Sequence, residues 1–421
     1  MSSVPTEEWL STLAAQYERY PYPNRDPEAE PAQHNRTMAN NLAAIAHYLN
    51  GGRPMHGQGF RALVAGGGTG DATVHLASQL AVEDPDAEIL HIDLSNASLA
   101  IAQKRVEGQG LKNVRFHQFN LLDLKPEHYG EFDYINCSGV LHHLPDPIEG
   151  LRRLRGVLKP HGGLSVMLYG TYGRIGVYQV QDIMRRLRAH DEDDLETAAQ
   201  LARELLKSLP PSNWQVRRAG GVPDRNSSTE EIVDKYLHPH DRPFTVPEIF
   251  DALDAAELTF AGFRHPLWYD PAAVLPEDTF GGRLRKMSVP ERAALGEILH
   301  GMYHSRHVFY ASRRMSAPVP PDPSDWLNVP VWIGQELSAG ESRIMFGGPI
   351  PSWISGEALA LLRGIDGTRS VRDLCQLFVE STLFGSEEDF RTSWSRVYRL
   401  LNGRGLLMLR RAGCPDGAGH P

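Results

Sequence analysis

Three glycines, Gly66, Gly68 and Gly70, recur at every second position directly after a short apolar run. The run is typical of a buried parallel strand, and apolar residues at helical spacing follow the glycines. In such a strand, glycine turn and helix, backbone N–H groups and the helix N-terminus face a ligand with no side chain between. The fingerprint of nicotinamide and flavin binding needs a further glycine where Asp71 stands, so a nicotinamide dehydrogenase is disfavoured.

Polar residues also end the later predicted strands. Asp93 lies in a predicted strand at 88–94, and Asn120 follows one at 114–119. Because these strands alternate with helices, they predict a parallel sheet covered on both faces. Ligands of such sheets lie beyond the carboxyl ends of the strands. The glycine loop, Asp93, Asn120 and the turn at 139–143 all fall at that edge.

The run Gly-Val-Leu-His-His-Leu-Pro-Asp-Pro at 139–147 follows a fourth predicted strand at 132–138. With the glycine loop, Asp93 and Asn120, it resembles the class I S-adenosylmethionine-dependent methyltransferases, in the same order over residues 60–170. The resemblance implies that the loop wraps the amino-acid end of S-adenosyl-L-methionine. It also implies that Asp93 accepts both ribose hydroxyls and that Asn120 accepts from the adenine amine, where the family often has aspartate. The implied cofactor site comprises Gly66, Gly68, Gly70, Asp71, Asp93, Leu94, Asn120, Leu121 and Ser138.

The order of elements and the resemblance together predict an α/β fold with a doubly wound, mostly parallel seven-stranded sheet. The Pro-His-Gly-Gly sequence at 160–163 is expected to end a helix, and a fifth strand follows at 164–168. Sixth and seventh strands are expected at 258–263 and 306–312. The methyltransferase domain would then span residues 51–315.

Two segments are expected to cover the ligand edge. An insertion at about 171–243 has helical periodicity and follows the fifth strand, where an inserted cap usually covers the acceptor site in this fold. Residues 1–50 contain helical stretches that are expected to form a lid, with Tyr22 in a proline-rich turn. A surface Pro-Tyr turn is the alternative for that segment.

A second, smaller domain is predicted at the C-terminal end. Four prolines in 316–323 make a stiff linker, and residues 324–421 contain three helical patterns and a closing strand, as in a winged-helix domain. Residues 316–421 carry ten arginines and twelve acidic residues, a net charge of −2. A winged helix that reads DNA has a basic face, so docking, peptide capture or homodimerisation is favoured over DNA binding.

A histidine could remove a proton from a methyl acceptor, because its pKa lies near neutrality. His142 matches a catalytic histidine of plant phenol O-methyltransferases, so the resemblance implies that His142 or His143 is the base. The alternative is that one ring caps the helix that begins at Asp146 or bonds the backbone.

The predicted cap contributes further polar side chains. Arg242 could bind an acceptor carboxylate with two hydrogen bonds, or form a surface ion pair with Asp241. His238, His240 and Asp241 stand too close together in a proline-interrupted loop for a metal site, so no metal is predicted. The residues expected to contact the acceptor are Tyr22, Tyr169, Tyr172, His238, His240 and Arg242.

The composition limits the possible partners and compartment. The 421 residues carry a net charge of −9, which disfavours a general binder of nucleic acids or anionic membranes. Three scattered cysteines support neither a disulfide framework nor a cysteine zinc site. The N-terminus lacks a signal pattern and no run of 18 apolar residues occurs, so a cytoplasmic location is predicted.

We therefore expect methyl transfer from S-adenosylmethionine to an oxygen, nitrogen or sulfur atom of a small molecule or a peptide. A protein or RNA methyltransferase is one alternative, and the acidic balance disfavours RNA. A non-catalytic cofactor-binding scaffold is an alternative of another class. The intact glycines and Asp93 disfavour it, because a scaffold has no need of them.

Overall fold

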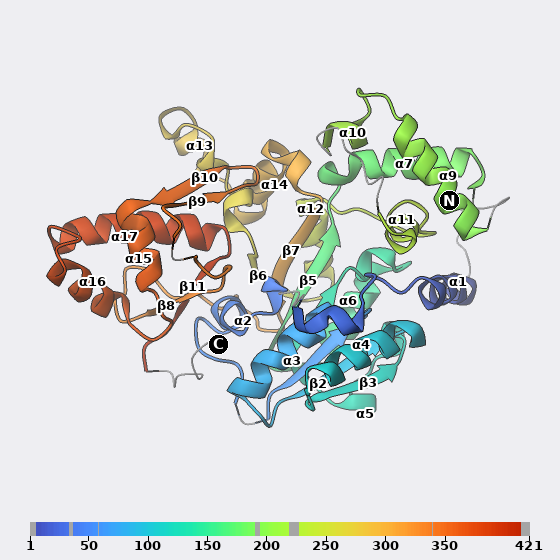
Figure 1. Ribbon diagram of the computed structural model, residues 1–421, viewed down its shortest axis with the longest axis horizontal. Helices are drawn as coiled ribbons and strands as arrows, with labels where there is room; N and C mark the ends of the chain where they lie inside the picture. The colour runs from blue at the N-terminus through green and yellow to red at the C-terminus, as the bar shows by residue number, and fades with distance from the viewer. Residues whose placement is uncertain are drawn as a thin grey trace.

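A single seven-stranded sheet lies at the centre of the molecule (Figure 1). The computed structural model describes residues 6–32, 37–57, 59–189, 194–218, 227–338 and 340–413. The strand order is β3-β2-β1-β4-β5-β7-β6, and only β7 runs antiparallel to its neighbours. This topology confirms the predicted doubly wound α/β fold. The strands are β1 (Arg61–Ala65), β2 (Glu88–Asp93), β3 (Val114–Gln118), β4 (Phe132–Ser138), β5 (Leu158–Tyr169), β6 (Thr259–Phe263) and β7 (Arg306–Ser312).

Both faces of the sheet are buried, because successive side chains of a strand point to opposite faces. In β1, Leu63 and Ala65 belong to one hydrophobic cluster, whereas Ala62 and Val64 belong to the other. The first cluster packs against α6 and α12, and the second against α2 and α3. The helices of the sheet layers are α2 (Leu42–Leu49), α3 (Asp71–Glu83), α4 (Asn96–Gly108), α5 (Pro126–Tyr129), α6 (Pro147–Gly156), α12 (Val246–Ala255), α13 (Gly282–Leu284) and α14 (Val289–Leu299).

Strand β5 is longer than predicted. It includes residues 160–163, which the sequence analysis assigned to a turn. Phe132 pairs with Leu158 and Tyr134 with Gly163, so β5 bulges between these two pairs. A Cβ atom on Gly162 would lie 2.9 Å from the carbonyl oxygen of Phe132, so this glycine permits the close approach. Pairing within the sheet thus overrides the local turn signal.

The two helical stretches of residues 1–50 lie in different places. Helix α1 (Thr6–Arg19) lies near the ligand edge and buries Trp9 and Leu13. Helix α2, in contrast, has seven of its eight residues buried and is part of the core of the sheet domain. A helix that is apolar on all sides is stable only inside a core. The expectation that residues 1–50 form a lid is therefore wrong for α2.

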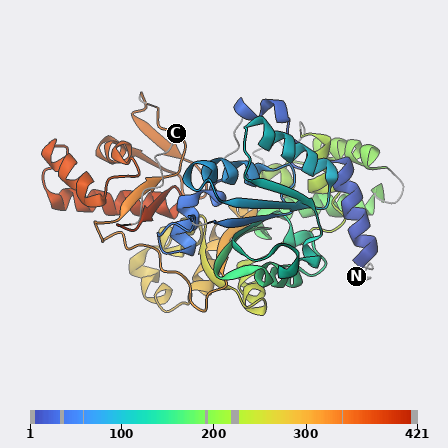
Figure 2. The ribbon, with the colours of Figure 1, turned by 90° about the horizontal axis from the view of Figure 1, so that it is seen from below.

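The insertion after β5 is helical, as predicted, and lies at one end of the molecule (Figures 1 and 2). Its helices share a hydrophobic cluster that also includes Tyr20 of the N-terminal segment. The glycine- and charge-rich stretch at 220–226, for which the sequence predicts a loop, lies outside the described residues. Among the described helices, none combines the length and the apolar composition needed to cross a bilayer. The helices of the insertion are α7 (Ile175–Arg186), α9 (Leu195–Ser208), α10 (Trp214–Arg218) and α11 (Thr229–Tyr236).

The C-terminal region lies at the opposite end and has its own core (Figure 2). It contains three helices and two two-stranded sheets, β8 with β11 and β9 with β10. Ser370 and Asp373 form the capping box of α16. The winged-helix assignment remains a prediction. The elements are β8 (Val329–Trp332), β9 (Arg343–Phe346), β10 (Ser352–Ser355), α15 (Gly356–Gly364), α16 (Val371–Glu380), α17 (Glu387–Gly403) and β11 (Leu407–Arg410).

This region also shares a core with the sheet domain. Val331, Ile333 and Met408 belong to the cluster that contains α2. The Nδ1 atom of His47 on α2 lies 3.3 Å from the backbone nitrogen of Leu409. The two domains are therefore joined by buried contacts as well as by the proline-rich linker.

One ionic cluster fixes the start of α3. Arg105 of α4 is fully buried and donates to the carbonyl oxygen of Thr69 at 2.7 Å and to Asp71 at 2.9 Å. Asp71 also accepts two hydrogen bonds from Arg25, at 2.9 and 2.7 Å. These bonds tie the glycine loop to α4 and to the N-terminal segment.

We predict that Asp71→Ala lowers the free energy of unfolding by about 3–5 kcal/mol, because the buried guanidinium of Arg105 loses its carboxylate. The control is Arg115→Ala, which removes a solvent-exposed ion pair with Glu88. That variant should change stability by less than about 0.5 kcal/mol. Urea unfolding of both variants measures the difference, and equal losses would contradict the prediction.

Candidate active site

The glycine loop at the end of β1 needs its glycines. Gly66, Gly68 and Gly70 have φ angles of 67°, 53° and 99°, in the left-handed region that favours glycine. A Cβ atom on Gly68 would lie 2.4 Å from the carbonyl oxygen of Tyr22. The N-terminal segment therefore lies directly against the loop, and Thr69 N donates to the same carbonyl at 3.3 Å.

Asp93 at the end of β2 organises this loop. Its Oδ2 accepts from Gly68 N at 2.8 Å, and its Oδ1 accepts from Ser95 N at 3.0 Å. Burial raises the pKa of the Asp93 carboxyl, and these backbone N–H bonds oppose that shift. Each carboxylate oxygen can accept a second hydrogen bond, so the residue is able to bind two ribose hydroxyls.

A cavity of about 430 Å³ adjoins Asp93, between α1 and the ends of β2 and β3. Leu94, Phe119 and Asn120 line it from the sheet side, and Leu10 and Ala14 from α1. A glycine loop, a carboxylate and an adjoining cavity follow one another along the ligand edge. The residues present therefore fit S-adenosylmethionine, and a contact of Asn120 with the adenine remains a prediction.

The remaining predicted cofactor residues lie near the same edge but in different settings. The carboxylate of Asp71 is bound to two arginines, and Leu121 is buried in the core. Ser138 accepts from Asn136 at 3.0 Å. The side-chain oxygen of Asn120 accepts from Leu122 N at 3.0 Å. Their roles toward the cofactor remain predictions.

Three histidines and a tyrosine stack beyond the end of β4. The ring centres of His142 and Tyr169 are 3.9 Å apart, and those of His143 and His238 are 3.8 Å apart. Nδ1 of His143 lies 2.9 Å from the carbonyl oxygen of His240. Burial lowers the pKa of His143 to about 4 and holds those of His142 and His238 well below the usual value. These rings are therefore neutral at neutral pH, and the same burial makes them weaker bases than an exposed imidazole.

Asp234 of α11 lies beside this stack, and the sequence analysis did not select it. Tyr17 OH donates to Oδ1 at 3.0 Å, and Tyr169 OH lies 3.5 Å from Oδ2. Burial raises the pKa of Asp234 to about 6. Burial, and next the charge of Asp234, raise the pKa of Tyr22 to about 12, as expected for a phenol near this carboxylate. The available signal was a carboxylate between apolar residues, in the sequence Ile-Val-Asp-Lys-Tyr-Leu.

Arg174 also joins the site without having been predicted. Its guanidinium lies 3.5 Å from the centre of the Tyr169 ring and bonds Asp241 at 2.8 Å. Gln181 and Tyr178 donate to Asp241 as well, at 3.0 and 3.3 Å. The charge of Asp241 is thus neutralised inside the cluster.

Ligand atoms of His142, His143 and Asp241 lie within 4.8 Å of one another, a grouping that could hold a metal ion. This set differs from His238, His240 and Asp241, whose spacing in the sequence disfavours a metal site. Since Arg174 already occupies the carboxylate, a metal ion would face a guanidinium there. This arrangement does not favour a metal.

Two predicted acceptor residues lie away from the stack. Arg242 is half exposed and forms an ion pair with Glu248 at 3.1 Å, while its backbone nitrogen donates to the carbonyl of His142. The guanidinium of Arg242 is therefore at the surface. Tyr172 lies in a short helical turn, against Gly301.

Comparison with known proteins agrees with the fold. Residues 63–164 match the family described as "Methyltransferase domain". The structure of PKMT2 from Rickettsia typhi superposes with a TM-score of 0.65 and 16% identity, over 90% of this chain and 75% of that one. Its complex with AdoHcy gives a TM-score of 0.63 and 15% identity, over 90% and 76%.

Two curated proteins are similar in sequence. The uncharacterized protein syc1184_c of Synechococcus is 32% identical over 293 residues, 68% of each chain. A ubiquinone biosynthesis O-methyltransferase of Acinetobacter baumannii is 29% identical over 76 residues, 18% of this chain and 32% of that protein. The chain thus spans about a third of that enzyme.

The fold, the glycine loop with Asp93 and the family match define an S-adenosylmethionine-dependent methyltransferase. The predicted activity class and cofactor are confirmed. Within this class, the chain belongs to the same family as syc1184_c of Synechococcus.

We predict that Asp93→Ala weakens S-adenosylmethionine binding by about 30- to 1000-fold, since two charge-assisted hydrogen bonds contribute roughly 2–4 kcal/mol. Titration calorimetry measures the dissociation constant. Asp123→Ala, an exposed carboxylate near the same edge, is the control and should bind normally. An unchanged constant in Asp93→Ala would show that the ribose is held elsewhere.

Proposed function

We propose that this methyltransferase methylates an amine nitrogen that enters the site as an ammonium group. The observation that carries the proposal is the buried carboxylate of Asp234 among the phenols of Tyr17, Tyr22 and Tyr169. Aromatic faces and a carboxylate attract the same kind of ligand, a cation. The amine belongs to a small molecule or to a peptide side chain.

The charge balance of the cluster supports a cationic acceptor. Within the described part of the chain, the cluster contains two carboxylates, Asp234 and Asp241, and one guanidinium, Arg174. Arg174 is paired with Asp241, and the histidine rings are neutral. The charge of Asp234 is left without a paired cation, and a buried charge is costly unless it is compensated.

An ammonium group has no lone pair, so it must lose a proton before the nitrogen can attack a methyl group. Asp234, whose pKa is about 6, can take that proton at neutral pH. Tyr17 and Tyr169 then hold the carboxyl group in place through their hydroxyls. When bound, S-adenosylmethionine supplies a methyl group on a positively charged sulfur. Helix α1 and the insertion together bury Asp234, through Tyr17 and the neighbouring side chains.

A hydroxyl acceptor is the second candidate. Both ring nitrogens of His142 are buried without a hydrogen-bond partner among the described residues. A neutral imidazole with a free lone pair could deprotonate a hydroxyl. Under this alternative His142, rather than Asp234, is the base.

We predict that kcat of the wild-type enzyme on an amine falls as the pH is lowered through about 6, because Asp234 must be ionised to accept the proton. This fall is the acid limb of the pH profile. Asp234→Asn should lose this limb and lower kcat by about 10²- to 10⁴-fold. Asp251→Asn, an exposed carboxylate on α12, is the control. The assay follows methylation of candidate amines and phenols. If Asp234→Asn keeps full turnover and His142→Ala does not, the hydroxyl alternative holds.

The same variant has a distinct effect on stability. The pKa of Asp234 is about 6 in the folded protein, higher than the unfolded value of about 3.9. The protonated carboxyl group therefore stabilises the folded state below pH 4, and this stabilisation is lost as the pH rises through 6. Asp234→Asn should therefore be more stable than wild type at pH 8, by about 3 kcal/mol, and show no such gain at pH 4. Unfolding in urea at both pH values separates lost catalysis from lost folding.

A further inference from the structure

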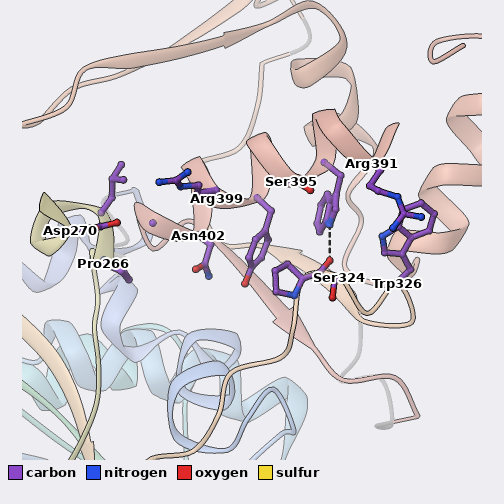
Figure 3. Close-up of a pocket in the computed structure, with 13 residues that line it drawn as sticks. Pro266, Asp270, Ser324, Trp326, Arg391, Ser395, Arg399 and Asn402 are labelled. Atoms are coloured by element: carbon purple, nitrogen blue, oxygen red, sulfur yellow. Dashed lines mark hydrogen bonds between the residues drawn. The ribbon is translucent and has the colours of Figure 1, made fainter. Parts of the chain in front are cut away.

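A groove of about 510 Å³ separates the turn at Pro266–Tyr269 from helix α17 of the C-terminal region (Figure 3). Along one wall, α17 presents residues at successive spacings of three and four, which place them on one face of a helix. Arg391 begins this row, Arg399 lies about two turns further along, and the largely buried Trp394 and Tyr398 lie between them. None of these residues belongs to the active site.

The charge of this wall differs from that of the whole chain, which is −9. Arg399 is exposed and forms no hydrogen bond or ion pair with any described residue. Arg391 lies 4.5 Å above the ring centre of Trp326, and its ion pair with Glu388 is exposed and long, at 3.4 Å. Two guanidinium groups therefore flank this stretch of the wall, and that of Arg399 remains available to an anionic partner. The opposite wall carries the carboxylate of Asp270, which is neutralised by Arg292 at 2.7 Å.

We propose that this groove binds an acidic polypeptide segment in an extended conformation. Arg391 and Asn402 lie eleven residues apart on α17, a rise of about 16 Å, which matches about five residues of extended chain. Arg391 and Arg399 lie eight residues apart, or about 12 Å, close to the separation of residues i and i+4 in an extended chain.

The geometry determines the sequence pattern of the partner. In an extended segment, residues i, i+2 and i+4 point the same way. Carboxylates at i and i+4 reach the two arginines, and an apolar side chain at i+2 faces the wall between them, where Trp394 and Tyr398 are largely buried. Arginine binds a carboxylate with two parallel hydrogen bonds, which favours aspartate or glutamate at both places. This interaction goes beyond the proposed methyl transfer and needs neither cofactor nor acceptor.

The test uses the full chain and fluorescence anisotropy of a labelled peptide with glutamates at i and i+4 around a phenylalanine at i+2. Arg399→Gln should weaken binding about tenfold or more, as expected when a charged hydrogen-bond pair is lost. Arg396→Gln is the matched control, because Arg396 is exposed on the same helix but does not line the groove. A peptide with glutamines in place of both glutamates should lose affinity to a similar extent.

The proposal is overturned if the glutamine peptide binds as tightly as the glutamate peptide, or if Arg396→Gln weakens binding as much as Arg399→Gln. It is also overturned if wild type fails to bind the peptide at millimolar concentration. Sedimentation at high protein concentration tests whether a second copy of this chain occupies the groove instead. A dimer that forms in wild type and Arg396→Gln but not in Arg399→Gln would assign the groove to that second copy and overturn the proposal. Melting temperatures of the variants confirm that they are folded.

Discussion

The carboxylate of Asp71 is bound from two sides, by Arg105 from the interior and by Arg25 from the N-terminal segment. The glycine loop, α4 and the segment that follows α1 are all connected through it. That segment also brings Tyr22 against the loop, and Tyr17 of α1 reaches Asp234 of the insertion. One partly buried carboxylate thereby links the cofactor side of the site to the acceptor side, and the position of each depends on the other.

Most of the sheet could be predicted because the relevant signals are local. Apolar runs, the glycine turn and the helix caps at Ser95 and Asp146 each lie within a few residues of the element they define. The predictions were wrong where contacts between residues far apart in the sequence determine the structure. The Pro-His-Gly-Gly sequence continues β5 because β4 pairs with its flanks, and α2 enters the core because β11 packs on it.

The sequence indicated several of the polar side chains of the candidate site, but not the charged residues that contact them. His142 and His143, which are neighbours in one helical turn, come together with Tyr169 and His238 as a stack, and their chemical roles remain predictions. Asp234 and Arg174 were missed because each belongs to an ordinary amphipathic helix or turn, where a lone charged residue is usually solvent-exposed. Only the folded chain reveals that both are buried.

The contact between α2 and the C-terminal region has a consequence for how the chain unfolds. Val331, Ile333 and Met408 share one core with a helix that comes from the other end of the sequence. Removing the C-terminal region at the proline-rich linker would expose the apolar surface of α2 to water. The stabilities of the two domains are therefore coupled across this contact.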